Sequence, residues 1–297
     1  MSGFVAVNGH VYPADQALIP AFDRAFLFGD GVYEIIAAVG PRLLDFEAHM
    51  DRLRRSSQAL HIGFPWTDAE LRFEIDHLLS LSQFPRSVIR VLISRGLGAA
   101  PRLTGREQAQ RYLFCMQDQS QGPQEFEKGL KLRTHRHPAP RPGEHVKSPA
   151  YLDAIVAHIE AKKDGFDDVL WLNREGELTE ASFANVFLLA REGDLLEIAT
   201  PPVAAGLLPG ITRHRLIDLL NRSRIPVTER SIALEELPRF DEGFVCSSIR
   251  GLVPVQSIDR HRLHSTRPQA SFRQILRLYQ AWEQSGEEKI VPQGEVH

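Results

Sequence analysis

The chain has 297 residues, of which 43% are hydrophobic and 25% charged, and 35 Lys and Arg residues face 38 Asp and Glu residues. The resulting net charge of −3 argues against a strongly basic nucleic-acid binder and against a polyanionic tail protein. Cys115 and Cys246 form no CxxC pair, and no apolar stretch approaches the length of a membrane span. Because the amino-terminal residues also lack the pattern of a signal peptide, we expect a cytosolic protein without nucleic-acid or membrane partners.

Strands and helices alternate in the first part of the sequence. Residues 4–12 predict a hairpin around an Asn-Gly turn, and residues 31–39 predict a largely buried strand. Apolar residues at helical spacing predict a helix over residues 46–60, and Thr67 begins a capping-box pattern for a second helix. Two further strands are expected at residues 87–94 and 111–117.

The second part of the sequence mixes helices and strands in a different order. Residues 149–164 predict a helix that Ser148 would cap, with Pro149 in its first turn. Later strands are expected at residues 168–172, 185–189 and 244–246, and later helices at residues 212–221 and 269–284.

The composition between these parts predicts two domains. Residues 118–124 are polar and turn-rich, which is typical of a linker, and the prolines within residues 135–143 exclude a helix there. Because strands and helices mix without strict βαβ alternation, we expect an α+β protein. Its small domain would span residues 1–117 and its large domain residues 125–297.

Several common catalytic patterns are absent from the sequence: the phosphate loop, GxGxxG, HExxH and GxSxG. His135, His137 and His145 lie in or near the proline-rich segment, but no Cys or carboxylate stands at ligand spacing from them. We therefore expect loop histidines and no metal site.

The segment Leu208-Pro209-Gly210-Ile211-Thr212-Arg213 opens the helix expected at residues 212–221. Glycine allows a close approach of the backbone, and the unpaired N–H groups of a first helical turn bind anions such as phosphate. An ordinary helix start uses the same residue types, so this segment alone leaves both interpretations open.

Lys147 is the best candidate among only six lysines for chemistry that needs an amine. It stands just before the expected helix, between Val146 and Tyr151, where desolvation would lower the pKa of its amine. That property is required of a Schiff-base lysine. A solvent-facing lysine is the alternative.

Glu180 stands beside small residues and ahead of the strand expected at residues 185–189. A carboxylate against a pyridine nitrogen keeps that nitrogen protonated and makes the ring an electron sink. The alternative is a surface glutamate in a turn.

In this order, these segments resemble the class IV, fold type IV pyridoxal-phosphate (PLP) enzymes. This family includes D-amino-acid transaminases, branched-chain aminotransferases, (R)-amine transaminases and aminodeoxychorismate lyase. The resemblance implies a smaller amino-terminal α/β domain, a larger carboxy-terminal domain with a mixed β-barrel-like core, and PLP as the cofactor. Its blocks are Phe22-Asp23-Arg24 with residues 28–34, residues 49–53, Lys147-Ser148, residues 179–187 and residues 208–213.

The resemblance also assigns roles to single residues. Lys147 is the expected catalytic lysine, Glu180 the partner of the pyridine nitrogen, and Leu208 a contact on one ring face. The expected cofactor-binding residues are Arg52, Glu180, Leu208, Ile211, Thr212, Ser247 and Ser248.

Residues 28–34 (FGDGVYE) are most similar to D-amino-acid transaminases, which hold the substrate carboxylate with an Arg-x-His pair and the strand tyrosine. Tyr33 is retained, but the loop at residues 95–104 is longer, and Thr104 stands where the histidine would be. Arg102 is the expected carboxylate ligand in this loop, with Arg95 as another candidate donor. The departure leaves room for (R)-primary amines as substrates.

The sequence therefore predicts a PLP-dependent transaminase that moves an amino group from a D-amino acid, or from an (R)-primary amine, to a 2-keto acid by ping-pong exchange. A branched-chain aminotransferase and a lyase of the same fold are the alternatives. A non-catalytic binding protein is disfavoured because Lys147 and Glu180 are both present. The resemblance also implies a homodimer in which residues 95–104 help to close a site of the partner chain.

Overall fold

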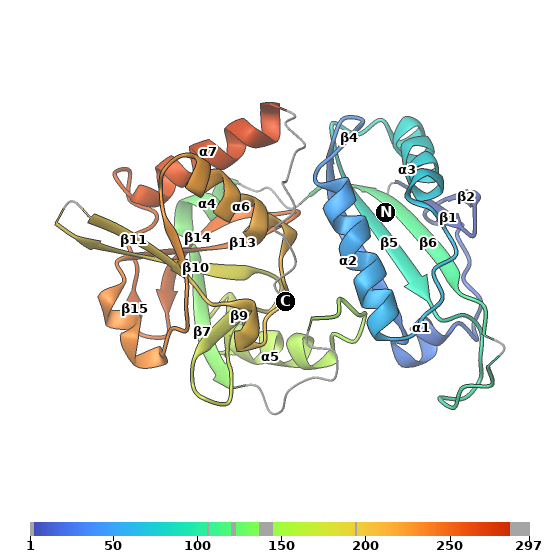
Figure 1. The fold of residues 1–297 in the computed structure, drawn as a ribbon, viewed down its shortest axis with the longest axis horizontal. Coiled ribbons are helices and arrows are strands. Elements are labelled where there is room, and N and C mark those ends of the chain that lie inside the picture. Colours follow the sequence, from blue (N-terminus) through green and yellow to red (C-terminus); the bar gives the residue numbers. More distant parts are fainter. Residues whose placement is uncertain (1–2, 106, 120–122, 137–144, 194, 286–297) are drawn as a thin grey trace. The chain divides into compact units, whose positions relative to one another are not determined.

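The computed structural model describes residues 3–105, 107–119, 123–136, 145–193 and 195–285. The chain divides into two compact units, drawn in Figure 1. Unit 1 comprises Met1–Ser120 and His145–Tyr151, and unit 2 comprises Gln121–Glu144 and Leu152–His297. The short segment His145–Tyr151, which carries Lys147, thus packs with the amino-terminal part of the chain, although the sequence placed it in the range 125–297.

Unit 1 contains a six-stranded sheet with the strand order β2-β1-β6-β5-β3-β4. Its strands are β1 (Gly3–Val7), β2 (His10–Pro13), β3 (Gly31–Val39), β4 (Arg42–Leu43), β5 (Arg86–Ser94) and β6 (Gln110–Gln117). All neighbouring strands pair antiparallel. The expected hairpin and the three expected longer strands of this part are therefore present, each within two residues of its predicted bounds.

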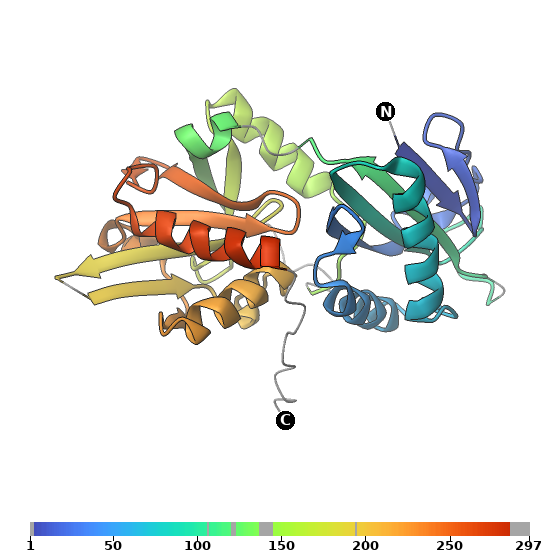
Figure 2. The same ribbon diagram turned by 90° about the horizontal axis from the view of Figure 1, so that it is seen from above.

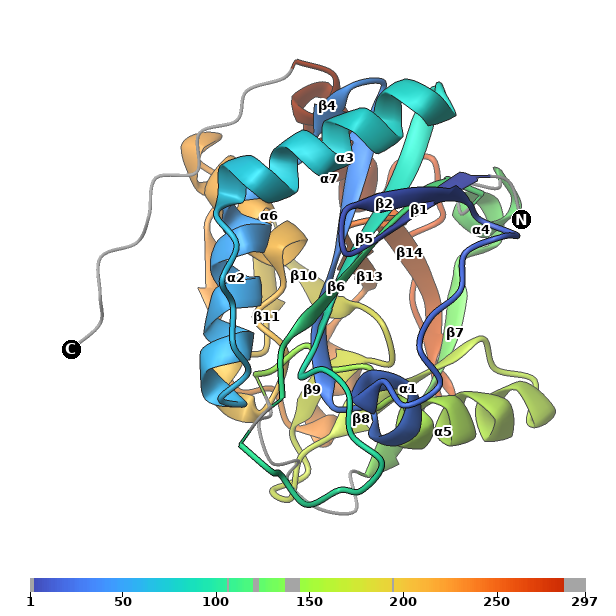
Figure 3. The same ribbon diagram turned by 90° about the vertical axis from the view of Figure 1, so that its right-hand side faces the viewer.

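Two of the three helices of unit 1 cover one face of this sheet, as Figure 3 shows. The helices are α1 (Arg24–Phe28), α2 (Phe46–Ala59) and α3 (Asp68–Ser82), of which α2 and α3 are the covering pair. The predicted capping box is confirmed: Thr67 Oγ1 accepts from the Glu70 amide at 3.2 Å, and the Glu70 carboxylate accepts from the Thr67 amide at 2.7 Å.

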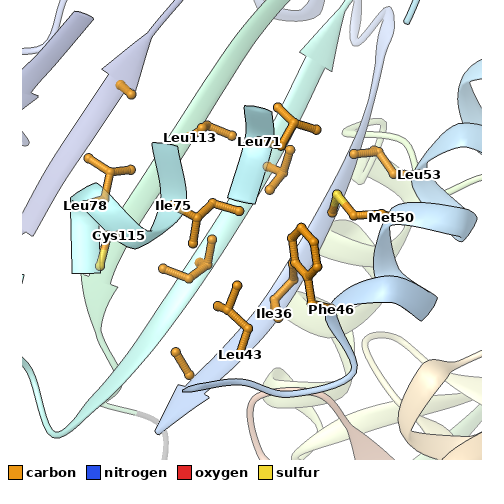
Figure 4. Close-up of a cluster of buried hydrophobic side chains, with 14 of the residues drawn as sticks. Ile36, Leu43, Phe46, Met50, Leu53, Leu71, Ile75, Leu78, Leu113 and Cys115 are labelled. Atoms are coloured by element: carbon orange, nitrogen blue, oxygen red, sulfur yellow. The ribbon is translucent and has the colours of Figure 1, made fainter. Parts of the chain in front are cut away.

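The core of unit 1 lies between this sheet face and the two helices (Figure 4). Because strand side chains alternate between faces, Val32, Glu34 and Ile36 of β3 point toward the helices, while Tyr33 points to the other face. The labelled core side chains are Ile36, Leu43, Phe46, Met50, Leu53, Leu71, Ile75, Leu78, Leu113 and Cys115.

Unit 2 is built around a closed ring of strands in the order β10-β13-β14-β7-β8-β9, which closes because β9 also pairs with β10. The β7–β14 and β7–β8 pairs are parallel and the others antiparallel, so the expected mixed barrel-like core is confirmed. The strands of unit 2 are β7 (Leu130–Arg136), β8 (Asp168–Leu172), β9 (Leu178–Ala181), β10 (Asn185–Glu192), β11 (Leu195–Thr200), β12 (Val227–Glu229), β13 (Glu242–Ser247), β14 (Gly251–Ile258) and β15 (His261–Arg262).

The helices of unit 2 pack on the outside of this barrel. They are α4 (Pro123–Lys128), α5 (Leu152–Lys163), α6 (Ile211–Arg222) and α7 (Ser271–Ser285), with short 3-10 helices at Val203–Ala205 and Leu234–Arg239. Figure 2 shows α6 and α7 side by side, and both contact β13. The end of the expected linker at residues 118–124 forms the start of α4, and residues 120–122 lie outside the described part.

One expected boundary is wrong. α5 begins at Leu152 and not at Pro149, so Ser148 does not cap it. The Ser148 amide instead bonds to the Val146 carbonyl at 3.1 Å, and the Tyr151 amide bonds to the Pro149 carbonyl at 3.0 Å. These tight turns keep residues 146–151 out of the helix. Most of the proline-rich range 135–143, including His137, lies outside the described residues.

The described residues contain two free, buried cysteines, and burial raises the pKa of Cys246 to about 12. None of the described helices is long and apolar enough to cross a bilayer. In the same part of the chain, no three His, Cys, Asp or Glu residues gather as a possible metal ligand set.

Candidate active site

Lys147 is held at an open edge of the sheet of unit 1. Strand β4 pairs with Ala38 and Val39, and among the described residues no strand pairs with the first half of β3 on that side. There the Tyr33 amide donates to the Lys147 carbonyl at 2.9 Å, and Val146 packs against the core. The ammonium group of Lys147 lies 4.8 Å from the centroid of the Tyr33 ring. Lys147 is therefore fixed against the ring that sequence analysis selected for substrate binding.

Tyr151 packs on the same ring. The centroids of Tyr33 and Tyr151 are 5.9 Å apart with the rings tilted, and the two hydroxyl groups are in hydrogen-bonding contact. The turn that ends at Tyr151 thus brings a second phenol group to Lys147 and Tyr33.

Arg90 is a candidate substrate ligand that sequence analysis missed. It lies on β5, on the face opposite the helices, and its guanidinium carbon is 4.9 Å from the centroid of the Tyr33 ring. Burial lowers the pKa of Arg90 from its ordinary value of 12.5. Among the described residues it has no ion pair or hydrogen bond through its side chain. A partly desolvated guanidinium without an anionic partner is suited to bind a carboxylate.

Arg52 is buried in a charged cluster on the helix-covered side of β3. Its Nε and Nη2 donate to the two oxygens of Glu34 at 2.6 and 2.8 Å, and His49 Nδ1 contacts the same carboxylate at 2.7 Å. The three side chains are at most 4% exposed. A guanidinium carries five N–H donors, so the bidentate contact with Glu34 does not by itself exhaust Arg52 as a ligand for phosphate.

The cluster keeps Glu34 ionised. Burial alone would raise the pKa of this carboxyl group, but Arg52 and His49 outweigh burial and hold the pKa well below its ordinary value of 4.5. Because the folded-state pKa is depressed, Glu34 stabilises the fold fully above pH 4.5 and loses this effect only as the pH falls toward the folded-state value.

The loop at residues 95–104 is anchored away from these groups by its own contacts. Arg95 Nε donates to both oxygens of Asp30, and its Nη atoms donate to the Leu60 and His61 carbonyls. Thr104 is exposed, and its hydroxyl donates to Glu107 at 2.9 Å. Arg102 is also exposed. Within unit 1, no hydrogen bond or ring contact brings Arg102 or Thr104 to Tyr33 or Lys147 in the described residues.

Glu180 of unit 2 is oriented by two neighbours. Its Oε1 accepts from the Leu208 amide at 3.1 Å, and its Oε2 accepts from Asn185 Nδ2 at 3.1 Å. Asn185 Nδ2 also donates to the Leu208 carbonyl at 3.0 Å. Asn185 thus links β10 to the segment before α6 and fixes the carboxylate between them, a role that sequence analysis did not assign.

The first turn of α6 forms an anion cradle in unit 2. Its N-cap residue, Gly210, has no side chain to cap the helix, and the first internal bond runs from the His214 amide to the Gly210 carbonyl. Thr212 Oγ1 lies 3.5 Å from Ser248 Oγ. Ser248 directly follows Ser247, the last residue of β13. A Cβ at Gly210 would lie only 1.9 Å from Asn185 Oδ1, so this position requires glycine. The predicted residues Glu180, Leu208, Ile211, Thr212 and Ser248 are therefore neighbours in unit 2.

Comparison with known proteins identifies the family to which the chain belongs. Residues 31–258 match the model of the family described as amino-transferase class IV. The chain therefore belongs to the class IV aminotransferases, and it is a PLP-dependent transaminase.

The relatives of the chain are named as aminotransferases of two different kinds of amino acid. A putative branched-chain-amino-acid aminotransferase of Methanocaldococcus jannaschii is 31% identical over 86% of this chain and 88% of the relative. A D-alanine aminotransferase of Bacillus licheniformis is 26% identical over 89% of this chain and 91% of the relative. The crystal structure of a branched-chain aminotransferase from Thermoproteus uzoniensis covers 97% of both chains at 26% identity, with a TM-score of 0.84.

The described residues fit the cofactor of this family. The amides of the first turn of α6 and the hydroxyls of Thr212 and Ser248 suit a phosphate group, and Glu180 suits a pyridinium. In addition, Ser182 Oγ is buried close to Glu180 in sequence and has no hydrogen-bond partner among the described residues, so it can serve a bound group.

Replacing Glu34 by Gln is expected to lower the free energy of unfolding by about 3 kcal/mol, because it leaves Arg52 buried without its counter-charge. Urea unfolding of the wild-type and variant proteins measures this loss, which should be the same at pH 8 and pH 5 because Glu34 is ionised at both. Glu47→Gln on the exposed side of α2 is the matched control and should change stability by less than about 0.5 kcal/mol. Equal losses in both variants would contradict the role of the cluster.

Proposed function

We propose that the chain transfers the amino group of a D-amino acid to a 2-keto acid. The observation that carries this proposal is the placement of Lys147 and Arg90 on one tyrosine ring. An amine and a guanidinium within 5 Å of the same centroid are less than 10 Å apart. In a 2-amino acid, the nitrogen that reacts and the carboxylate that is bound are separated by a single carbon, and each hydrogen bond spans about 3 Å. A 2-amino acid is therefore long enough for its nitrogen and its carboxylate to be reached by two side chains this far apart.

We assign the carboxylate of the substrate to Arg90 in preference to Arg102. Arg90 is half-buried, it lies on Tyr33, and no carboxylate in the described part of unit 1 neutralises it. A bidentate guanidinium–carboxylate contact in such a site is stronger than one at an exposed loop. Arg102 then remains a second ligand, which the loop would supply in the dimer.

The predicted cofactor-binding residues are proposed as ligands of PLP. When bound, PLP supplies an electron sink for the bond broken at the substrate Cα. Lys147 Nζ would move the proton from this carbon to the C4′ carbon of the cofactor, and Glu180 would hold the proton of the pyridine nitrogen. Arg52, Ser247, Ser248, Thr212 and the amides at the start of α6 bind the phosphate, with Ile211 contributing one of these amides and Leu208 packing on the ring.

The D-configuration is supported by the segment 28–34 and by the D-alanine aminotransferases among the relatives. The second candidate is a branched-chain L-amino acid, which the 31% identity to the Methanocaldococcus jannaschii protein favours. An (R)-primary amine would use Lys147 and Tyr33 but leave Arg90 without a counter-charge, so it would be the weaker donor.

A homodimer is supported by an exposed apolar surface on unit 1. Phe22, just before α1, is 62% exposed, and Phe26, within α1, is 65% exposed. In the neighbouring loop, Leu97 and Leu103 are 49% and 52% exposed. Arg24 holds this loop to α1 through the carbonyls of residues 100 and 101. An apolar surface that combines a helix with the expected closing loop suits a second copy of the chain.

Borohydride reduction of the PLP-loaded protein is expected to fix the cofactor covalently on Lys147, because this lysine is held against Tyr33. Peptide mapping by mass spectrometry identifies the labelled residue. The other five lysines are internal controls and should stay unlabelled. A label on any of them would overturn the assignment.

Glu180→Gln is expected to lower kcat about a hundredfold, which corresponds to about 3 kcal/mol of transition-state stabilisation. An amide cannot hold the pyridinium proton, and its NH₂ group must face one of the two donors on Glu180. Cofactor content after dialysis should fall much less than kcat. Glu175→Gln, in an exposed turn, is the control, and an unchanged kcat in Glu180→Gln would show that this carboxylate serves another purpose.

Arg90→Gln is expected to raise KM for D-alanine about tenfold or more, because a buried charge-assisted contact is lost. Its kcat/KM for (R)-1-phenylethylamine, a donor without a carboxylate, should stay within about twofold of the wild-type value. Half-reactions followed by the absorbance of the bound cofactor measure both.

Arg102→Gln and the exposed Arg55→Gln are run beside Arg90→Gln in the same assay. A selective loss of D-alanine turnover in Arg102→Gln alone would move the carboxylate site to the loop. Exclusive use of L-leucine and its relatives by the wild-type protein would establish the branched-chain alternative.

Phe26→Ser is expected to weaken self-association at least about tenfold, because it removes the most exposed aromatic side chain of α1. Sedimentation equilibrium of the PLP-loaded protein measures the dimer dissociation constant. Phe73→Ser on α3, which removes a 76% exposed phenylalanine outside this surface, is the matched control. A fully active wild-type monomer would rule out the dimer.

A further inference from the structure

Unit 2 contains a groove of about 710 Å³ that is separate from all residues assigned above to the cofactor and the substrate. It is bounded by the start of β7, the turn between α5 and β8, the β14–β15 hairpin and the residues that follow this hairpin. Four of its lining residues are the exposed cations Lys131, Arg260, Arg262 and Arg267. Four positive side chains on one groove are a marked excess in a chain whose net charge is −3.

The positive charge of this groove is only partly offset by the protein. The side chains of Lys131, Arg260, Arg262 and Arg267 make no ion pair or hydrogen bond among the described residues. The groove also contains Asp164 and Asp259, but other groups already bind these carboxylates.

Asp164 accepts from Arg133 Nη1 at 2.5 Å. Asp259 accepts from the amide and the hydroxyl of Thr134 at 2.8 and 2.7 Å. Asp259 keeps its charge, because both of its donors are neutral, but the four cations outnumber the two carboxylates and leave the groove with a net positive charge that attracts an anion from solution.

The backbone under the cations is fixed by hydrogen bonds. The Asp259 amide donates to the Leu132 carbonyl at 2.8 Å, which ties the hairpin turn to β7. β14 and β15 pair as a hairpin, and the turn between them carries Arg260. The backbone positions of Arg260 and Arg262 are thus set in advance, so that only their side chains lose freedom when a ligand contacts both.

We propose that this groove binds an oligophosphate. A chain of linked phosphates carries several negative charges at short intervals and can contact several guanidinium groups together, which a single phosphate cannot. Phe166 also lines the groove and is half-buried, so its ring is available to a nucleobase. The shared chemistry is the oligophosphate, and its source is either a nucleoside triphosphate or an inorganic polyphosphate.

Calorimetric titration of the PLP-loaded protein with inorganic tripolyphosphate, at low ionic strength, tests this proposal. Loading with PLP fills the phosphate cradle of the proposed active site, so binding there does not contribute. We expect tripolyphosphate to bind at least about tenfold more tightly than orthophosphate, and added salt to weaken binding.

The triple variant Arg260→Gln, Arg262→Gln and Arg267→Gln is expected to weaken tripolyphosphate binding about tenfold or more. A matched triple variant removes three exposed arginines that lie outside the groove, by the changes Arg55→Gln, Arg174→Gln and Arg224→Gln. It has the same net charge and should bind within about twofold of the wild-type protein. The thermal transition of each variant shows that the fold is retained.

Titration with ATP distinguishes the two sources. Tighter binding of ATP than of tripolyphosphate, with this advantage lost in Phe166→Leu, would identify a nucleotide, and equal binding would identify the inorganic chain. Three results would overturn the proposal: absence of tripolyphosphate binding, equal losses in the two triple variants, or binding of a single-stranded oligonucleotide without binding of either small ligand.

Discussion

The place of Lys147 in unit 1 depends on one backbone hydrogen bond, from the Tyr33 amide to the Lys147 carbonyl. It joins two segments that are more than a hundred residues apart in sequence, and it adds Lys147 to an edge of the sheet that the two-residue strand β4 leaves open. A longer β4 would pair with the same part of β3 and displace Lys147. The ring that contacts the lysine and the amide that holds its backbone belong to the same residue, so the position of Lys147 follows directly from β3.

Successive side chains of β3 alternate between the two faces of the sheet, so two neighbouring residues take part in two separate polar clusters. Tyr33 points to the open face of the sheet, where Lys147 and Arg90 lie, and Glu34 points under the helices to Arg52. A charged residue in a strand otherwise filled with apolar side chains is costly unless a partner neutralises it. Arg52 offsets this cost, and Glu34 in turn fixes the guanidinium that we propose as a phosphate ligand.

Elements with local signals could be predicted from the sequence, whereas features set by distant contacts could not. The strand at residues 31–39 and the capping box at Thr67 depend on nearby residues, and both were correct. The start of α5 was wrong because the segment before it is tied to β3 by a contact that Pro149 and Ser148 do not reveal.

The same contrast between local signals and distant contacts applies to the predicted cofactor and substrate ligands. Glu180, Leu208, Ile211 and Thr212 belong to two short segments, and Asn185 joins these segments through its side chain. Arg90 was missed because a charged residue in an alternating strand reads as a solvent-facing position, and its contact with Tyr33 crosses between two strands. Arg95 stood out as a donor, yet its bonds to Asp30 and to two carbonyls show a structural role.

Glu34 and Glu180 show how the surroundings of a carboxylate decide what it can do. Glu34 faces a guanidinium at hydrogen-bonding distance, so its charge is used inside the fold. The two bonds shown on Glu180 come from a backbone amide and a carboxamide, two neutral donors that orient the carboxylate. The same distinction holds for the two arginines on either side of β3: Arg52 is balanced by Glu34, and Arg90 is left for the anion that the substrate brings.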